Sequence, residues 1–161
     1  MDDCCNKCPL KLYNDEFYQG VGSRVNGSII FILQKYDKEI INDIVNLYQT
    51  TTSKSFNENC YITFKVRCDT KNSLYDVYEA ALHNCLYKLY KDIVPSNFKY
   101  YFVFGGYGYP IIRNGTKSRY ELIYKRKVYN VFPSERIKYC DSDKYDSVLN
   151  DIKELIIKYN L

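Results

Sequence analysis

The chain has 161 residues, which suits a single domain with its own hydrophobic core. Hydrophobic residues make up 46% and charged residues 26%, as in globular proteins, and no apolar run is long enough to span a bilayer. The net charge of +4 is too mild to identify a partner. The first residues, MDDCCNKC, are acidic and cysteine-rich, unlike a signal peptide. We therefore expect an intracellular protein, in the cytoplasm of a host cell or bacterium, or associated with a nucleoid.

The predicted elements alternate between strand and helix. In chain order, the patterns predict a strand at 28–33, a helix at 38–48, a polar loop at 50–59, a strand at 60–67, a helix at 73–93, a strand at 99–106, a basic hairpin around 113–119, a strand at 127–132 and a helix at 143–159. This alternation predicts an α/β domain over residues 1–161, with a central, mostly parallel four-stranded sheet in three α/β/α layers.

The predicted sheet has one edge where ligands would bind. In parallel sheets, ligands bind beyond the carboxyl ends of the strands. We therefore expect the residues that follow Leu33, Phe64, Phe104 and Phe132 to meet at one edge.

Four of the seven cysteines have a spacing that indicates a metal site. Cys5 and Cys8 form a C-x-x-C, and Cys68 and Cys85 follow at the end of a predicted strand and on a predicted helix. In an intracellular protein, four such thiolates suit zinc or an iron–sulfur cluster. Structural zinc sites usually pair two short C-x₂₋₄-C motifs, so a [4Fe–4S] cluster is the preferred cofactor and zinc the alternative.

The other cysteines and the single histidine can be explained without a role in catalysis. Cys4 is an alternative ligand to Cys5, whereas Cys60 and Cys140 look like bystanders. Buried thiols in the core and a mobile tail would also explain the four cysteines. His83, near Cys85, is expected at the surface or beside the cluster, without a catalytic partner.

Basic residues gather near the C-terminal half of the chain. Between residues 113 and 138 only Glu121 and Glu135 oppose them, and the basic positions are Arg113, Lys117, Arg119, Lys125, Arg126, Lys127, Arg136 and Lys138. Such a cluster favours contact with phosphates, although a solvated hairpin is the alternative. Tyrosine is frequent at 19 residues, which favours an AT-rich genome, viral or bacterial, over a general role in stacking on bases.

The order of these features resembles a known family. The chain runs from Cys5-Asn-Lys-Cys8 through GVGSRVNGSIIFIL, then YITFKVRC, Cys85 after 16 further residues, YYFVFG, VYNVFPSERI and SVLNDIKELI. Over almost its whole length this order resembles the iron–sulfur, thermophile-type (family 4-like) branch of the uracil-DNA glycosylase superfamily. The resemblance implies a glycosylase-like fold, a cluster held by the four cysteines, and an ancestry in enzymes that flip a base out of DNA and cleave its glycosidic bond.

The chain departs from that family at each catalytic motif. Gln34, in LQKYD, replaces the acid of the water-positioning motif, and Asp37 is the nearby carboxylate that would have to substitute. Phe64 stands where the family has asparagine, and Phe132 where it has histidine. Phenylalanine donates no hydrogen bond, and one lost catalytic group typically costs about 10²–10⁴ in rate.

The sequence thus favours a protein that has lost glycosylase activity and acts as a DNA-binding or accessory protein in replication or transcription, plausibly in a virus. Phosphate contacts are expected from Arg113, Lys117, Arg119, Lys125, Arg126, Lys127, Ser134 and Arg136. The first alternative is an active DNA glycosylase with altered catalytic residues or base specificity. The second is a protein-interaction subunit of a polymerase assembly.

Overall fold

The computed structural model describes residues 8, 10, 17–68, 84, 85, 88, 89, 93, 97–105, 121–124 and 127–161. The predicted hairpin around 113–119 and most of the helix predicted at 73–93 lie outside them, although residues 84, 85, 88, 89 and 93 are helical. Also outside are Cys4, Cys5, His83, Arg113, Lys117, Arg119, Lys125 and Arg126. No helix in the described part is both long and apolar enough to cross a membrane.

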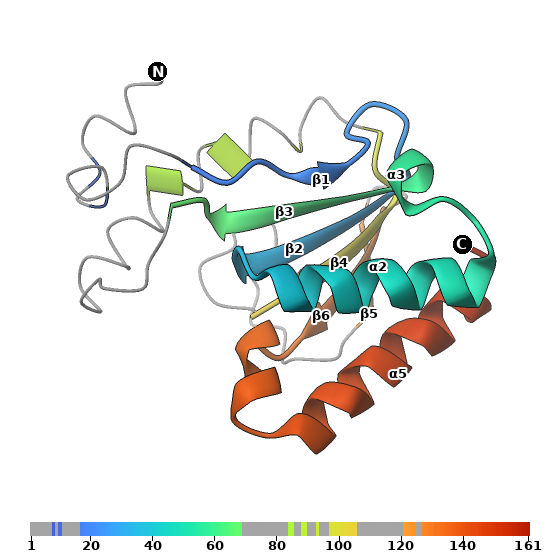
Figure 1. Cartoon of the computed structure of the whole chain (residues 1–161). Coiled ribbons are helices and arrows are strands. Elements are labelled where there is room, and N and C mark those ends of the chain that lie inside the picture. The colour runs from blue at the N-terminus through green and yellow to red at the C-terminus, as the bar shows by residue number, and fades with distance from the viewer. Residues whose placement is uncertain are drawn as a thin grey trace.

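A six-stranded sheet in the order β1-β3-β2-β4-β6-β5 forms the centre of the fold (Figure 1). The strands are β1 (Val21–Gly22), β2 (Ile29–Lys35), β3 (Cys60–Val66), β4 (Tyr100–Phe104), β5 (Glu121–Tyr124) and β6 (Lys127–Phe132). β3, β2, β4 and β6 are the four predicted strands, and they run parallel to one another. The predicted α/β class with a mostly parallel sheet is therefore confirmed.

The two edge strands correct the predicted strand count. β1 pairs antiparallel with β3, and β5 pairs antiparallel with β6. They are only two and four residues long, so neither is long enough to show a period-two pattern in the sequence. The sheet therefore has a parallel centre of four strands with an antiparallel strand on each side.

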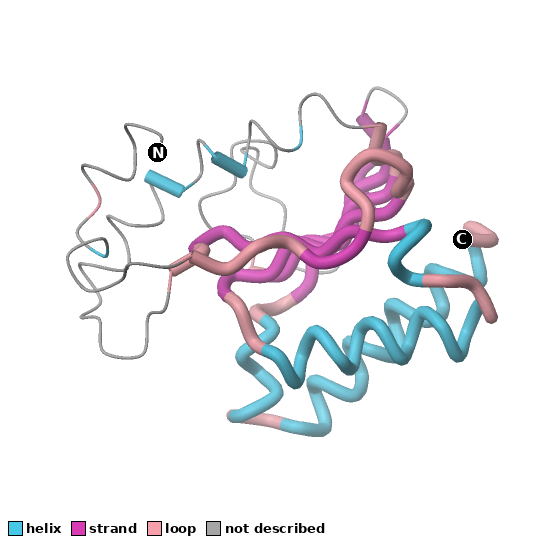
Figure 2. Tube along the Cα trace, turned by 45° about the horizontal axis from the view of Figure 1, so that its top comes forward, coloured by secondary structure: helices cyan, strands magenta, loops and turns pink. Residues whose placement is uncertain are grey.

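Helices cover one face of this sheet. α2 (Lys38–Thr52) and α5 (Ser142–Lys158) pack against each other there, as Figure 2 shows, and the 3-10 helix η3 (Glu135–Tyr139) joins β6 to α5. Alternate strand residues such as Phe31 and Phe102, with ring centroids 4.9 Å apart, form the core on this side. On the opposite face, Leu89 and Ile93 pack with Ile30 and Ile32. Helical residues thus lie on both faces, as a three-layer fold requires.

The polar stretch 50–59, predicted as a loop, is largely helical. α2 continues to Thr52, whose hydroxyl donates to the Tyr48 carbonyl at 2.8 Å, and it ends at Ser53 with φ 57°. The short helix α3 (Phe56–Asn59) follows, because Phe56 is fully buried against the rings of Phe31 and Tyr48. Local composition missed this segment because one buried aromatic residue holds it on the core.

Gly22 offers a test of the β1–β3 edge. Its φ is +100°, and a Cβ there would lie 2.2 Å from the Cys60 carbonyl oxygen. Gly22→Ala is expected to lower the free energy of unfolding by about 2–3 kcal/mol, because both the conformation and the contact are unfavourable for alanine. Urea denaturation would measure the loss. Asn26→Ala, in the exposed turn nearby, is the control and should stay within about 0.5 kcal/mol of the parent.

Candidate functional site

The carboxyl ends of the four parallel strands meet as predicted. The strand pairing places Leu33 beside Phe64 and Phe104 beside Phe132. We call the residues at and just beyond these ends the carboxyl edge: 34–37, 65–67, 105 and 133–136. The chain crosses from one side of β2 to the other at this point, since β3 and β4 flank β2. Such a switch point is where open α/β sheets usually bind ligands.

A buried carboxylate joins two of these strand ends. Glu135, the first residue of η3, has no exposed surface, and its Oε1 accepts hydrogen bonds from the backbone N–H groups of Gln34 (2.8 Å) and Lys35 (3.2 Å). Its Oε2 is buried without a hydrogen-bond partner. Burial raises the pKa of Glu135 to about 7, although these hydrogen bonds and the charge of Lys65 oppose the shift.

A buried amine joins the other two strand ends. The Lys65 side chain is 1% exposed, and its Nζ donates to the carbonyl oxygens of Phe104 (3.0 Å) and Gly105. Burial lowers the pKa of Lys65 to about 8, while the charge of Glu135 acts in the opposite direction. Glu135 therefore connects β6 to β2, and Lys65 connects β3 to β4.

The side chain of Gln34 covers the middle of the edge. Its Oε1 accepts a hydrogen bond from the Ser134 hydroxyl at 3.1 Å, and its amide lies against Gly105. A Cβ on Gly105, where φ is +69°, would come within 2.0 Å of the Gln34 Nε2. Gly105 is thus needed both for its backbone conformation and for the space that the amide takes. A neutral amide in this place cannot act as a general base.

Asp37, the carboxylate that would have to substitute in catalysis, has other partners. It caps α2 by accepting from the N–H groups of Glu39 (3.0 Å) and Ile40 (3.2 Å). Its Oδ2 accepts from the Tyr139 hydroxyl at 2.6 Å and pairs with Arg136 at 3.4 Å. The hydrogen bond to Asp37 raises the pKa of Tyr139 to about 12. This carboxylate holds η3 against the start of α2.

Phe64 and Phe132, the two residues for which the sequence comparison predicts a loss of polar groups, are both buried. Phe64 is fully buried, and Tyr36 meets its ring at 5.5 Å in an edge contact. Phe132 is 2% exposed and packs against Phe102 and Phe104, at 6.1 and 5.5 Å between ring centroids. Both rings belong to the core on the α2–α5 face and offer neither a donor nor an acceptor.

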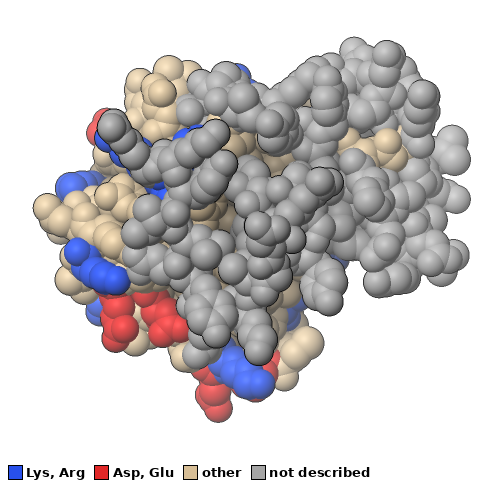
Figure 3. Space-filling view, turned by 180° about the vertical axis from the view of Figure 1, so that it is seen from behind, with Lys and Arg blue, Asp and Glu red and all other residues tan. Residues whose placement is uncertain are grey.

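Three of the predicted phosphate-binding residues are described. Arg136 is exposed, and Ser134 is half-buried beside it at the carboxyl edge. Lys127, at the start of β6, donates to the Tyr101 hydroxyl at 3.2 Å and lies away from that edge. Figure 3 shows cationic and anionic side chains side by side among the visible described atoms.

Two of the predicted thiolate ligands are associated with one small hydrophobic cluster. Cys8 is buried in a small cluster with Leu10 and Val66, and Cys68 packs against this cluster. Cys85 is buried on the other predicted ligand segment. Among the described residues no three Cys, His, Asp or Glu side chains are grouped closely enough to hold a metal ion, and Cys5 lies outside them.

The two remaining described cysteines are Cys60 and Cys140. Cys60 is fully buried in the core beside Tyr48, and burial raises the pKa of its thiol to about 12. Cys140 is exposed after η3. The five described cysteines form no disulfide with one another.

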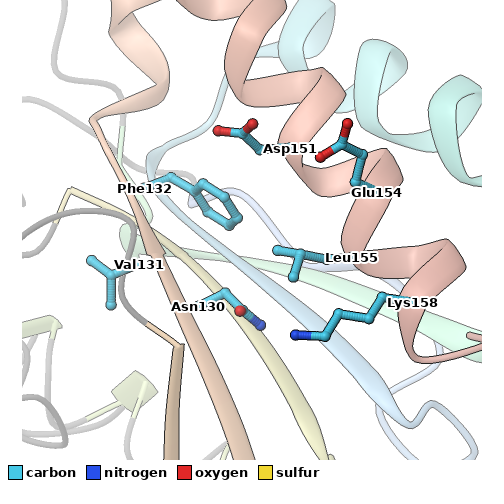
Figure 4. A pocket seen from close by; sticks show the side chains of 7 residues that line it. All are labelled: Asn130, Val131, Phe132, Asp151, Glu154, Leu155 and Lys158. Carbon is cyan, nitrogen blue, oxygen red and sulfur yellow. The ribbon is translucent and has the colours of Figure 1, made fainter.

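A separate cleft of about 360 Å³ lies between β6 and α5 (Figure 4). Its lining comes from these two elements: Asn130, Val131, Phe132, Asp151, Glu154, Leu155 and Lys158. The amide Nδ2 of Asn130 is buried at its base without a hydrogen-bond partner. Except for Phe132, none of these residues belongs to the predicted site, and the cleft lies beneath the sheet rather than beyond its carboxyl edge.

The two charged residues that organise the edge were not recognised in the sequence. Glu135 follows a proline and a serine and looks like the exposed start of a turn. Lys65 is a single charge inside the apolar run of β3. A charge in the middle of a continuous buried strand is the one signal that indicates such a residue, because it must find a partner when the strand is buried.

Comparison with protein-family models finds no match, and comparison with curated proteins finds none either.

The variant Glu135→Gln tests the raised pKa of the buried Glu135 carboxyl, because it removes the contribution of this group to the pH dependence of stability. The pKa of about 7 lies above the ordinary 4.5, so the folded protein binds this proton more tightly than the unfolded chain. The resulting stabilisation is complete below pH 4.5 and is lost as the pH rises through 7. Relative to the Gln variant, the wild type should therefore lose up to about 3 kcal/mol of unfolding free energy across that interval.

Denaturant unfolding at closely spaced pH values between 4.5 and 7.5 would measure this difference. Lys65, with a pKa of about 8, stays protonated over most of the interval, so its contribution changes little there. Glu154→Gln, at an exposed position of α5, controls for the substitution itself. If the difference in unfolding free energy between wild type and Glu135→Gln does not vary with pH, the raised pKa of Glu135 is contradicted.

Proposed function

We propose that this protein binds DNA without excising bases, on a scaffold related to the iron–sulfur uracil-DNA glycosylases. One observation supports this most directly: the carboxyl edge keeps surface groups that suit phosphates, whereas Phe64 and Phe132 fill the positions that would act on a base. Binding needs cations and hydrogen-bond donors at the surface. Excision needs in addition a positioned water and a donor to the departing base, and phenylalanine provides neither.

The exposed Arg136 is the main phosphate ligand in this proposal. Its side chain is 44% exposed and pairs with Asp37 at 3.4 Å. Arg136 is the exposed partner of this pair, whereas the Asp37 side chain is only 12% exposed, so a phosphate from solvent can approach the guanidinium and compete with Asp37 for it. Ser134 and the half-buried Lys35 lie along the same edge and would contact neighbouring phosphates. The basic segment 113–126, where other phosphate contacts are predicted, lies outside the described residues.

An active glycosylase with altered residues is the less favoured alternative. Asp37 caps α2 and binds both Arg136 and Tyr139, so using it as a base would break contacts that hold η3. Glu135 has a pKa near neutrality, but it has no exposed surface through which to reach a substrate. A polymerase subunit with this fold remains a second alternative, and it predicts weak DNA binding together with a stable protein partner.

The proposal includes a [4Fe–4S] cluster held by Cys5, Cys8, Cys68 and Cys85. Its support is the spacing of the cysteines in the sequence and the packing of Cys68 against the hydrophobic group of Cys8, Leu10 and Val66, which lies at the end of β3. The cluster would have a structural role, attaching that segment and the predicted helix 73–93 to the sheet. Zinc on the same thiolates is the alternative cofactor.

DNA binding is tested by fluorescence anisotropy with labelled DNA over a range of salt concentrations. We expect binding that weakens as salt rises, and no abasic sites in DNA that contains uracil. Arg136→Ala should weaken binding about three- to tenfold and reduce the salt slope by about one, because it removes one phosphate contact. Lys153→Ala, on the exposed side of α5, is the matched control. Equal effects of the two substitutions, or cleavage of the glycosidic bond, would contradict the proposal.

The cofactor is tested by iron and acid-labile sulfide analysis of protein purified without oxygen. We expect about four of each per chain, and their loss in Cys68→Ser. Cys140→Ser, at the exposed cysteine, should keep the wild-type content. Zinc without sulfide would establish the alternative, and the absence of any metal would remove the cluster from the proposal.

A further inference from the structure

Exposed aromatic rings are rare in the described part of the chain, and they lie at one place. The exposed large hydrophobic residues there are Phe17, Val25, Tyr139 and Ile157. Both aromatic residues among them lie next to the carboxyl edge. The N–H of Tyr18 donates to the Arg67 carbonyl at 2.7 Å, which fixes the segment with Phe17 beside the end of β3. Tyr139 binds Asp37, just beyond the end of β2.

A pair of stacked tyrosines lies between these two exposed rings. Tyr18 and Tyr36 have ring centroids 3.9 Å apart and planes inclined by only 6°. Tyr36 is fixed from its other side by the edge contact with the buried Phe64. Both tyrosines are half-buried, and Tyr18 is the outer ring of the three. The arrangement has the nearly parallel geometry of stacked bases.

Cations accompany both exposed rings. Nζ of Lys88 lies 4.9 Å from the centroid of the Phe17 ring, and the guanidinium carbon of Arg136 lies 4.8 Å from that of Tyr139. Lys35, in the same edge, immediately precedes Tyr36. Aromatic faces flanked by cations along one groove or edge are the arrangement by which proteins hold single strands, since bases stack on the rings and phosphates meet the charges.

We infer that the preferred ligand of the carboxyl edge is single-stranded DNA, with bases stacked on Phe17, Tyr18 and Tyr139. This inference rests on the proposed function and specifies its ligand. A duplex keeps its bases stacked on one another and would use only the cations of this edge. A single strand uses the rings as well, so its affinity depends on them. Phosphates between successive bases would contact Lys35 and Arg136.

The experiment compares an oligothymidine of about 15 nucleotides with a hairpin duplex of the same strand length, by fluorescence anisotropy on the full chain at one salt concentration. We expect tighter binding of the single strand. Tyr18→Leu and Tyr139→Leu should each weaken it about tenfold, while duplex affinity changes little. Tyr18→Phe and Tyr139→Phe keep the ring and should bind like the wild type.

Tyr159→Leu is the matched control. Tyr159 also contacts another tyrosine, Tyr100, at 5.4 Å, but Tyr100 begins β4, so the pair lies at the opposite end of the sheet. Tyr139 is 51% exposed, so its substitution tests the ring even if Tyr18→Leu unfolds the segment around it. Thermal denaturation of each variant identifies any that are unfolded.

The outcomes separate the two proposals. Binding of single strand and duplex with equal affinity, unchanged in the leucine variants, would overturn the single-strand inference and leave DNA binding in place. Absence of binding to either DNA would overturn both. Equal losses in Tyr139→Phe and Tyr139→Leu would also count against stacking, because they would assign the effect to the hydroxyl that binds Asp37.

Discussion

The buried carboxylate of Glu135 is the constraint on which the carboxyl edge depends. Two backbone N–H groups at the end of β2, those of Gln34 and Lys35, donate to the Glu135 carboxylate, which comes from the segment that follows β6. The burial of a charge is costly, and hydrophobic pairs often replace buried ion pairs without loss of stability. The Glu135 carboxylate and the Lys65 amine have a role that apolar side chains could not fill, because they form hydrogen bonds with backbone N–H and carbonyl groups at the strand ends. Glu135 and Lys65 do so for all four central strands.

Outside this pair, a second layer of polar contacts holds η3 against α2. Asp37 binds Arg136 and Tyr139, while Asp43 accepts from Lys138 at 2.6 Å and from the Tyr145 hydroxyl at 2.8 Å. The 3-10 helix is therefore fixed from below by the sheet and from the side by α2. Side chains on such a support keep one arrangement, which suits a surface that binds an extended ligand better than a pocket that must close around a base.

The central parallel strands were predictable because their residues are apolar without interruption, as in IIFIL and YYFVF. The short strands β1 and β5 and the helix α3 depend on pairing and on one buried ring, which no local pattern contains. The meeting of Gln34, Phe64 and Phe132 at one edge was predictable from topology alone. The roles of Glu135 and Lys65 were not, since their partners are distant in the chain and a single charge usually indicates a surface position. The grouping of the four cysteines stays a prediction.

The long separation between Glu135 and its partners has a consequence for how the protein is made. The hydrogen bonds to Gln34 and Lys35 span 101 and 100 residues, so that edge cannot close until most of the chain has been synthesised. The apolar side of α2 is likewise fully covered only when α5, which begins at Ser142, has formed. Contacts between segments remote in the sequence slow folding. An incomplete parallel sheet also exposes apolar, unpaired strands that are prone to aggregate. Until β6, η3 and α5 have been made, β2 and β3 lack part of the packing that covers them in the folded protein.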